Sequence, residues 1–213
     1  MSLISWIILF SLLGGVLSVL AAAIFLLLPD TARHRILPHF ISFAIGALLG
    51  AAFLALLPHA MEGVQDFHLL GLSVLLGILG FFLLERMVLW RHCHVEHCEA
   101  HDPEETAHRH AAGTLVLIGD GIHNLVDGVL IAAAFLTDIH LGIVTSLAVA
   151  AHEIPQEVGD FAVLLHSGYS RGKAFVFNVL SSLTTLVGAL AAYWSLANVQ
   201  HMLPYILAIA ASS

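Results

Sequence analysis

Residues 3–28 read LISWIILFSLLGGVLSVLAAAIFLLL, an apolar run without a single charged side chain. An α-helix rises about 1.5 Å per residue, so a run of this length can cross the roughly 30 Å of hydrocarbon in a bilayer. Comparable apolar runs follow at about 38–61, 69–90, 112–136, 140–166 and 172–198, and another begins near 202 and is cut off at Ser213. The sequence therefore predicts an all-α protein, a polytopic transmembrane helix bundle of six complete helices and a truncated seventh.

The composition agrees with a protein built for lipid. Of the 213 residues, 59% are hydrophobic and 10% are charged, and the mean hydropathy is +0.95, whereas soluble domains carry about 25% charged residues. Long runs of Leu, Ala, Val and Ile favour helices over the short alternating strands of a membrane barrel. Because even the longest connection, 91–111, is short, residues 1–213 are predicted to form a single transmembrane domain. No basic cluster suited to nucleic acid occurs.

Basic residues indicate how the chain is oriented. They lie in or beside alternate connections, as Arg33, Arg35, Arg86, Arg91, Arg109, Arg171 and Lys173. The other connections carry Glu62, Asp66 and Asp138. The positive-inside rule then places the first, third and fifth connections in the cytoplasm and the N-terminus outside. The first run lacks a basic region before it, so we expect a retained helix in a plasma (inner) membrane protein.

Two of the apolar runs carry polar stripes. The fourth reads LIGDGIHNLVDGVL (117–130), and the fifth reads VAAHEIPQEVGDF (149–161). Charged groups at membrane depth cost about 2.5–3.5 kcal/mol each on insertion scales, so they face a protein interior and mark function. Helical geometry gathers the polar residues on one face of each helix, and the short connection 137–139 makes the helices antiparallel neighbours. Interhelical hydrogen bonding alone is the alternative, but the stripes are dense for that role.

Facing stripes of imidazole, carboxylate and amide groups predict a divalent cation site. The predicted metal ligands are His123, Asn124, Asp127, His152, Glu153, Gln156 and Glu157. Pro155 would leave the carbonyl of Ala151 without its helical partner, and unwound backbone at this depth is tolerated beside an ion site.

The fifth run nearly spells HExxH, the zinc motif of helical metalloproteases. Gln156 stands where the second histidine should be, and Pro155 interrupts the turn. A site with an incomplete set of strong ligands suits a cation that must be released again. The sequence therefore favours a transporter, and not an enzyme. An intramembrane metal-dependent hydrolase and a nontransporting metal sensor are the alternatives.

These two motifs resemble those of the ZIP (Zrt/Irt-like protein) family of metal transporters. HNLVDG (123–128) resembles its fourth-helix motif HNxxDG, and HEIPQEVGD (152–160) resembles the fifth-helix motif HExPHExGD of one branch. Weaker agreement covers LLPHAMEG (56–63) and FNVLSSLTTLVGA (177–189). The resemblance implies an eight-helix transporter that imports Zn²⁺, or in some relatives Fe²⁺, Mn²⁺ or Cd²⁺, through a mononuclear or binuclear site between the fourth and fifth helices. A homodimer is a candidate assembly.

The sequence departs from that pattern in two places. Gln156 replaces a histidine, and an amide oxygen is a harder ligand that shifts preference slightly toward manganese or iron. The eighth helix that the resemblance implies is absent from these residues.

Further positions are weaker candidates. Accessory or outer roles are predicted for His59, Glu62, Asp120, Asp160 and Asn178. Hydrogen bonding between helices is expected for Ser181 and Ser182, and is the alternative role for Asn178. The histidine-rich loop RHCHVEHCEAHDPEETAHRH (91–110) could capture metal through His92, His94, His97 and His101, or could be a solvated loop with incidental affinity. Its cysteines, in a predicted cytoplasmic loop, are not expected to form a disulfide. Close helix packing, inside the bundle or between protomers, is expected at Gly46 and Gly50, and at Gly77 and Gly80.

Overall fold

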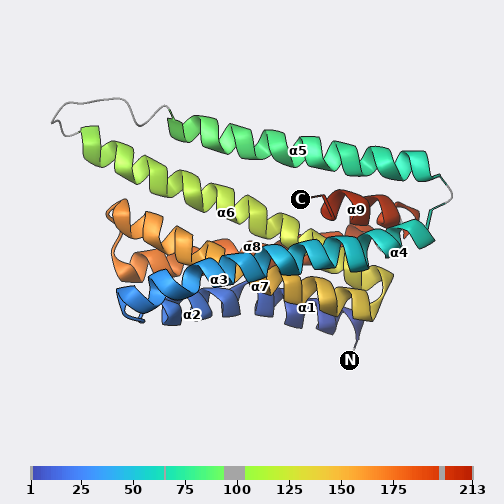
Figure 1. The fold of residues 1–213 in the computed structure, drawn as a ribbon, viewed down its shortest axis with the longest axis horizontal. Helices are drawn as coiled ribbons and strands as arrows, with labels where there is room; N and C mark the ends of the chain where they lie inside the picture. The colour runs from blue at the N-terminus through green and yellow to red at the C-terminus, as the bar shows by residue number, and fades with distance from the viewer. Residues whose placement is uncertain (1, 65, 94–103, 197–199, 213) are drawn as a thin grey trace.

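The computed structural model describes residues 2–64, 66–93, 104–196 and 200–212, and nearly all of them are helical (Figure 1). In chain order the helices are α1 (Leu3–Gly14), α2 (Val16–Phe25), α3 (Asp30–Ala51), a π-helical turn (Ala52–Leu56), α4 (Leu57–Glu62), α5 (Phe67–Cys93), α6 (Glu104–Thr137), α7 (Ile139–His166), α8 (Arg171–Leu196), a 3₁₀ turn (Gln200–Met202) and α9 (Leu203–Ala210). The described residues contain no strand, so the prediction of an all-α bundle is confirmed.

Several helices are suited to a bilayer by length and composition. The segments that qualify are Leu3–Phe25, Thr31–Glu62, Gly113–Thr137 and Arg171–Leu196, and a shorter apolar helix covers Phe67–Leu83. Helix α7 has 28 residues and is equally long, but its second half carries three carboxylates. Together these helices make the chain an integral membrane protein.

The first predicted span is bent, and not the single helix expected over 3–28. It ends as a helix at Phe25 and is divided at Gly15, whose ψ of −85° lies outside the helical range. A Cβ at Gly15 would lie 2.7 Å from the backbone oxygen of Ser182. The absence of a side chain therefore lets the bend approach α8 closely.

The second predicted span begins earlier than expected, at Asp30 instead of near residue 38, and it includes Pro38. Farther along, the backbone N–H of Leu57 bonds to the carbonyl of Ala52, five residues back, which widens one turn into a π-helix just before Pro58. Pro58 cannot donate to the preceding turn, and a π-bulge is one way for a helix to absorb such a defect. Helices α3 and α4 therefore form one continuous rod.

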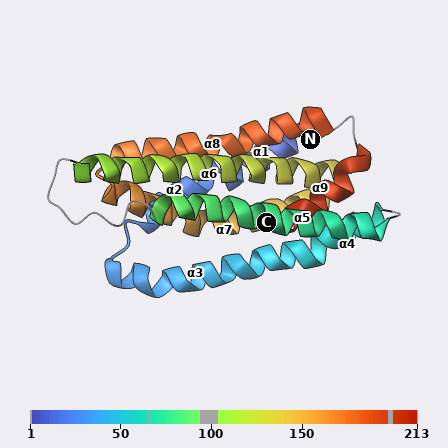
Figure 2. The same cartoon turned by 90° about the horizontal axis from the view of Figure 1, so that it is seen from above.

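Helix α6 lies at the centre of the bundle. It packs most extensively against α8 and next against α7, as the two views of the ribbon show (Figures 1 and 2). Glycines make the α6–α8 contact close, since a Cβ at Gly128 would collide with the backbone oxygen of Thr185, and one at Gly188 with that of Leu125. Small residues of this kind allow backbones to touch in membrane bundles.

Helices α3 and α5 are peripheral. Helix α3 packs mainly on α7 and lies at one edge in Figure 2, while α5 packs mainly on α9. A Cβ at Gly46, Gly50 or Gly80 would meet nothing within 4 Å, whereas one at Gly77 would meet α9. Gly46 and Gly50 therefore make no close contact within the described residues, and their packing against another protomer stays a prediction.

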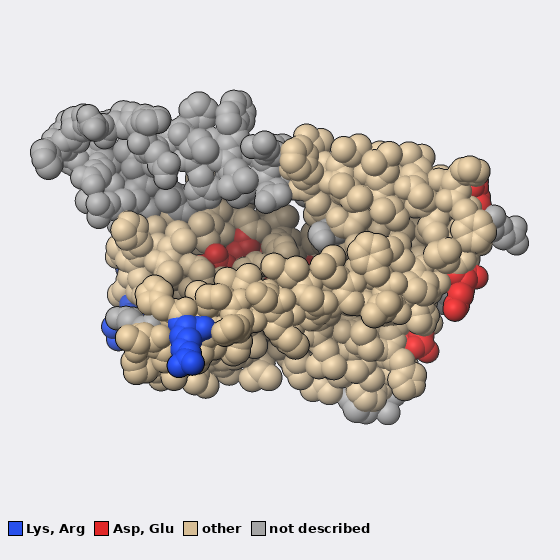
Figure 3. Space-filling view, viewed as in Figure 1, with Lys and Arg blue, Asp and Glu red and all other residues tan. Residues whose placement is uncertain are grey.

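The two ends of the bundle differ in charge. Arg33, Arg35, Arg171 and Lys173 lie where α3 and α8 begin, which we name the basic end. Glu62, Asp66 and Asp138 lie at the opposite end, which we name the acidic end. Figure 3 shows blue side chains at one end of the molecule and red ones at the other. The alternation of basic connections seen in the sequence thus becomes a separation in space.

Asp138 starts α7 at the acidic end. Its side chain accepts hydrogen bonds from the backbone N–H groups of Leu141 at 3.1 Å and His140 at 2.8 Å. These two hydrogen bonds hold the pKa of the Asp138 carboxyl below its usual range, and the one from Leu141 has the larger effect. The cap fixes the point at which the chain reverses between α6 and α7.

Candidate metal centre

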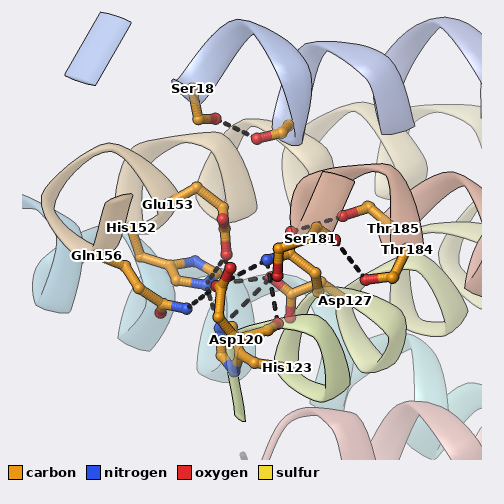
Figure 4. A network of polar contacts seen from close by, with 12 residues as sticks. Ser18, Asp120, His123, Asp127, His152, Glu153, Gln156, Ser181, Thr184 and Thr185 are labelled. Atoms are coloured by element: carbon orange, nitrogen blue, oxygen red, sulfur yellow. Dashed lines mark hydrogen bonds and ion pairs between the residues drawn. The ribbon is translucent and has the colours of Figure 1, made fainter. Parts of the chain in front are cut away.

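Four side chains from α6 and α7 converge near the middle of both helices. His123 and Asp127 come from α6, and His152 and Glu153 come from α7. His123 and Asp127 are one helical turn apart and so point the same way, and Figure 4 shows them facing the α7 side chains. These four residues, which we name the metal centre, bring together four of the seven predicted ligands.

The donor atoms of the metal centre have the spacing that a metal ion needs. The two imidazole Nε2 atoms are 3.0 Å apart. His152 Nε2 lies 3.1 Å from Asp127 Oδ2 and 3.4 Å from Glu153 Oε1. His123 Nε2 lies 3.5 Å from Glu153 Oε1 and 3.8 Å from Asp127 Oδ2. Donors about 2.0 Å from a zinc ion stand ~3.3 Å apart at the corners of a tetrahedron, so the arrangement fits one small dication.

The two carboxylates of the metal centre are buried, so when charged they need a positive partner. Glu153 is 1% exposed, and apart from the imidazoles neither of its oxygens meets a hydrogen-bond donor. Asp127 Oδ2 is likewise buried without a hydrogen bond. Buried carboxylates are costly unless they are paired or bind a metal. The side chain of His123, by contrast, is 42% exposed, so one ligand borders open space.

The amides of Asn124 and Gln156 are placed differently from the other predicted ligands. Asn124 Nδ2 donates to Asp120 Oδ1 at 2.9 Å, and Gln156 Nε2 donates to the same oxygen at 3.1 Å. Asn124 Oδ1 accepts from Thr185 Oγ1 at 2.7 Å. Both ends of the Asn124 amide are thus engaged beside the metal centre, and direct coordination by Asn124 or Gln156 stays a prediction.

Helix α8 supplies a row of hydroxyl groups that the sequence reasoning used only in part. Thr185 bonds Asn124, Thr184 Oγ1 donates to the carbonyl of Gly121 at 2.7 Å, and Ser181 Oγ donates to that of Leu117 at 3.4 Å. Interhelical hydrogen bonding was expected for Ser181, but Thr184 and Thr185 were missed. Their spacing with Ser181 places all three on one helical face, which is the signal that could have identified them.

A small cavity lies between the metal centre and the acidic end. Its volume is about 80 Å³, and its lining includes Leu56 of the π-turn, Leu130 of α6, and Thr145, Ala148 and Val149 of α7. The lining side chains are apolar except for that of Thr145, so they offer a hydrated cation few oxygen donors.

On the face shown in Figure 3, acidic side chains are visible at the floor of a recess.

The accessory candidates do not join the metal centre. His59 lies on α4, where its Nδ1 is 2.9 Å from the carbonyl oxygen of Ala55, and Glu62 ends the same helix. Asn178 is fully buried on α8, and neither polar atom of its amide has a hydrogen-bond partner. His92 lies in α5, and His94, His97 and His101 fall outside the described residues.

The remaining carboxylates lie farther toward the basic end. Asp120, Glu153 and Glu157 form a second group, in which one oxygen from each lies within 4.8 Å of the others. Asp160 follows on α7 and has a buried Oδ2 without a hydrogen bond.

Comparison with known proteins identifies the family. The family model described as ZIP zinc transporter matches residues 2–111 and 90–211. Zinc transporter ZIP13 of Pongo abelii is 37% identical over 165 residues, which cover 72% of this chain and 47% of that protein. Zinc transporter YKE4 of Saccharomyces cerevisiae is 32% identical over 170 residues, covering 72% and 48%. The chain spans about half the length of these curated relatives. It belongs to the ZIP family of zinc transporters.

Proposed function

We propose that this protein carries Zn²⁺ across the membrane toward the cytoplasm, through the metal centre between α6 and α7. The observation that carries the proposal is the convergence of four donor atoms, with Nε2–Nε2 and Nε2–oxygen separations of 3.0–3.8 Å, inside an apolar helix bundle. The relatives named as zinc transporters support zinc as the cargo.

The donor set favours zinc but admits other dications. Two imidazole nitrogens and two carboxylate oxygens are ligands that zinc commonly takes in proteins. The same mixture suits Fe²⁺, Mn²⁺ and Cd²⁺ to differing degrees, since neither donor type is strongly selective. Transport of these ions is therefore an expected secondary activity.

Catalysis fits the geometry less well than transport. A catalytic zinc keeps three protein ligands and an open position for water. In the metal centre four protein donors fill the tetrahedron, and the position that would hold the second histidine of a protease motif is Gln156, whose amide donates to Asp120. The partial exposure of His123 supplies the access that loading and release require.

The charge distribution supports inward transport. The basic end is the cytoplasmic end under the positive-inside rule. From the metal centre, further buried carboxylates continue along α6 and α7 toward that end, whereas the cavity on the opposite side is apolar. The route that is already lined with oxygen donors therefore points to the cytoplasm.

The test is zinc uptake into proteoliposomes that contain the purified protein. Replacing both histidines, His123→Ala with His152→Ala, should abolish uptake because two of four donors are lost. His140→Ala is the matched control, since His140 is an exposed histidine on the same helix as His152, and it should leave uptake unchanged. Unchanged uptake in the double variant would remove the metal centre from the transport path. Zinc that stays tightly bound without crossing would instead favour a metal sensor.

A further inference from the structure

We infer that Thr185 of α8 sets the metal preference of the metal centre, by holding the amide oxygen of Asn124 away from the bound ion. Thr185 acts through Asn124 and is therefore a positioning residue. The inference deepens the proposed function and rests on it only in taking the metal centre as the place where the cargo binds. It assigns Asn124 to the support of the centre, in place of the coordination predicted from the sequence.

The hydrogen bond between Thr185 and Asn124 is short and buried. Thr185 Oγ1 donates to Asn124 Oδ1 at 2.7 Å, and the two residues are 1% and 0% exposed. In such surroundings a hydrogen bond is stronger than in water. The amide oxygen of Asn124 is therefore held toward α8.

The nitrogen of the same amide is held on its own helix. Asn124 Nδ2 donates to Asp120 Oδ1 at 2.9 Å and to the backbone carbonyl of Asp120 at 3.2 Å. Because a carbonyl oxygen only accepts hydrogen bonds, the nitrogen must face Asp120 and the oxygen must face Thr185. The amide cannot turn without losing hydrogen bonds at both ends.

Asn124 lies close enough to the metal centre for its oxygen to affect the bound ion. Its Cα is three residues from that of Asp127, which places the two side chains one turn apart and about 60° apart around the helix axis. Helix α6 packs against both α8 and α7, and Figure 4 shows Thr185 and His152 on opposite sides of Asp127. The bond from Thr185 thus turns the oxygen toward α8, whereas the other pair of donors comes from α7.

The number of donors decides which dication the centre prefers. Without Asn124 the centre offers two imidazole nitrogens and two carboxylate oxygens, a set suited to tetrahedral Zn²⁺. Mn²⁺ prefers octahedral sites rich in oxygen. A released amide oxygen would add a fifth, hard donor and shift the preference toward Mn²⁺. Leaving that oxygen buried without a hydrogen bond is costly, which favours its coordination to the ion.

The test measures metal preference in the purified, detergent-solubilised protein, and it does not require transport. Co²⁺ at the metal centre is followed by its visible absorption, and Zn²⁺ and Mn²⁺ are titrated as competitors. The spectrum of the variant with His123→Ala and His152→Ala, which retains the histidine-rich loop, is subtracted to remove the contribution of that loop.

The variants separate the hydroxyl of Thr185 from the general packing of α8. Thr185→Val removes the donor and keeps the shape, while Thr185→Ser keeps the donor. Thr184→Val is the matched control, because the neighbouring threonine donates to the carbonyls of Gly121 and Ser181 and not to Asn124.

We expect Thr185→Val to raise the affinity for Mn²⁺ relative to that for Zn²⁺ by about tenfold. The Co²⁺ absorption should weaken in this variant, since five-coordinate Co²⁺ absorbs less strongly than four-coordinate Co²⁺. Thr185→Ser and Thr184→Val should keep the wild-type preference and spectrum. Adding Asn124→Ala to Thr185→Val should restore the wild-type preference, because the released oxygen is then removed.

An unchanged preference in Thr185→Val would overturn the inference. An equal change in Thr184→Val would overturn it too, because any loosening of α8 would then alter the centre, and so would a change that persists after Asn124→Ala. If Thr185→Val yields no folded protein, Thr185→Ala, which also removes the donor, takes its place with the same expected outcomes. Failure of the wild-type protein to take up zinc would count against the proposed function and leave the metal preference unaffected.

Discussion

At the scale of single residues, Asp120 belongs to a hydrogen-bond network that joins three helices. Its Oδ1 accepts from Asn124 on its own helix and from Gln156 on α7, and Asn124 accepts from Thr185 on α8. All four side chains are buried or partly buried. Removing one member of a buried polar network leaves its partner without a hydrogen bond, which is costly in apolar surroundings. The network should therefore be sensitive to loss of its outermost hydroxyl.

Thr185→Val tests this network. Valine has nearly the same shape as threonine but cannot donate to Asn124 Oδ1, so a buried amide oxygen would lose its partner. We expect the free energy of unfolding to fall by about 1–3 kcal/mol. Thermal unfolding in detergent measures the change, and Thr185→Ser, which keeps the hydroxyl, should be closer to the wild type. Equal stability of the two variants would show that the hydroxyl is unimportant.

The site was predictable where helical periodicity alone decides which side chains meet. His123 and Asp127 share a face because they are four residues apart, and the short turn at Asp138 brings α7 alongside. The direction of the Asn124 and Gln156 amides was not predictable from their own helices. It depends on Thr185, which is 61 positions from Asn124 in the chain, and on which oxygen of Asp120 is available.

At the scale of helices, α6 packs more extensively against α8 than against any other described helix. This contact depends on Gly128 and Gly188, at which an added Cβ would collide with the backbone of the opposite helix. Backbone cannot move aside as a flexible side chain can. The absence of two side chains therefore sets the spacing of these two helices. That spacing in turn allows the hydrogen bond from Thr185 to Asn124.

Gly188→Ala should separate α6 from α8. We expect a loss of about 1–3 kcal/mol in unfolding free energy from overpacking, together with weaker Co²⁺ binding at the metal centre. Thermal unfolding and Co²⁺ absorption measure the two effects. Gly50→Ala is the control, because a Cβ there meets nothing within 4 Å, and it should stabilise the protein by about 0.5–1 kcal/mol. A stability for Gly188→Ala equal to that control would refute the close contact.

Hydropathy predicted the existence and order of the helices well, because each must bury its backbone polar groups within itself in lipid. It did not predict the bend at Gly15 or the π-turn before Pro58. Both are local changes of backbone shape, and hydropathy does not distinguish a straight apolar helix from a bent one. They depend on the neighbour, which for Gly15 is the backbone of Ser182.

At the scale of the whole molecule, the described charges occupy opposite ends while the middle holds carboxylates and imidazoles in an apolar shell. Two buried apolar clusters flank the metal centre. One gathers around Ile131 and Phe135 toward the acidic end, and the other around Val158 and Phe161 toward the basic end. Apolar packing thus lies on both sides of the polar centre along the bundle, at the depth where an ion has the most to gain from protein ligands.

The orientation can be tested with single cysteines. In a background with Cys93→Ser and Cys98→Ser, Glu62→Cys marks the acidic end and Ser170→Cys marks the basic end, and both positions are exposed. A membrane-impermeant thiol reagent added to intact cells should label Glu62→Cys, and should label Ser170→Cys only after permeabilisation. The reverse pattern would invert the topology and with it the direction of transport proposed for the centre.

The division of the four donors between two helices has a mechanical consequence. Because α6 supplies one pair and α7 the other, a bound dication acts as a tether between two rods that are otherwise joined mainly through packing. Ion binding and the distance between the two helices are then coupled. Binding draws the helices together, and a force that separates them lowers the affinity for the ion by the same coupling free energy. Lateral tension or bilayer thickness could thereby tune how firmly the ion is held.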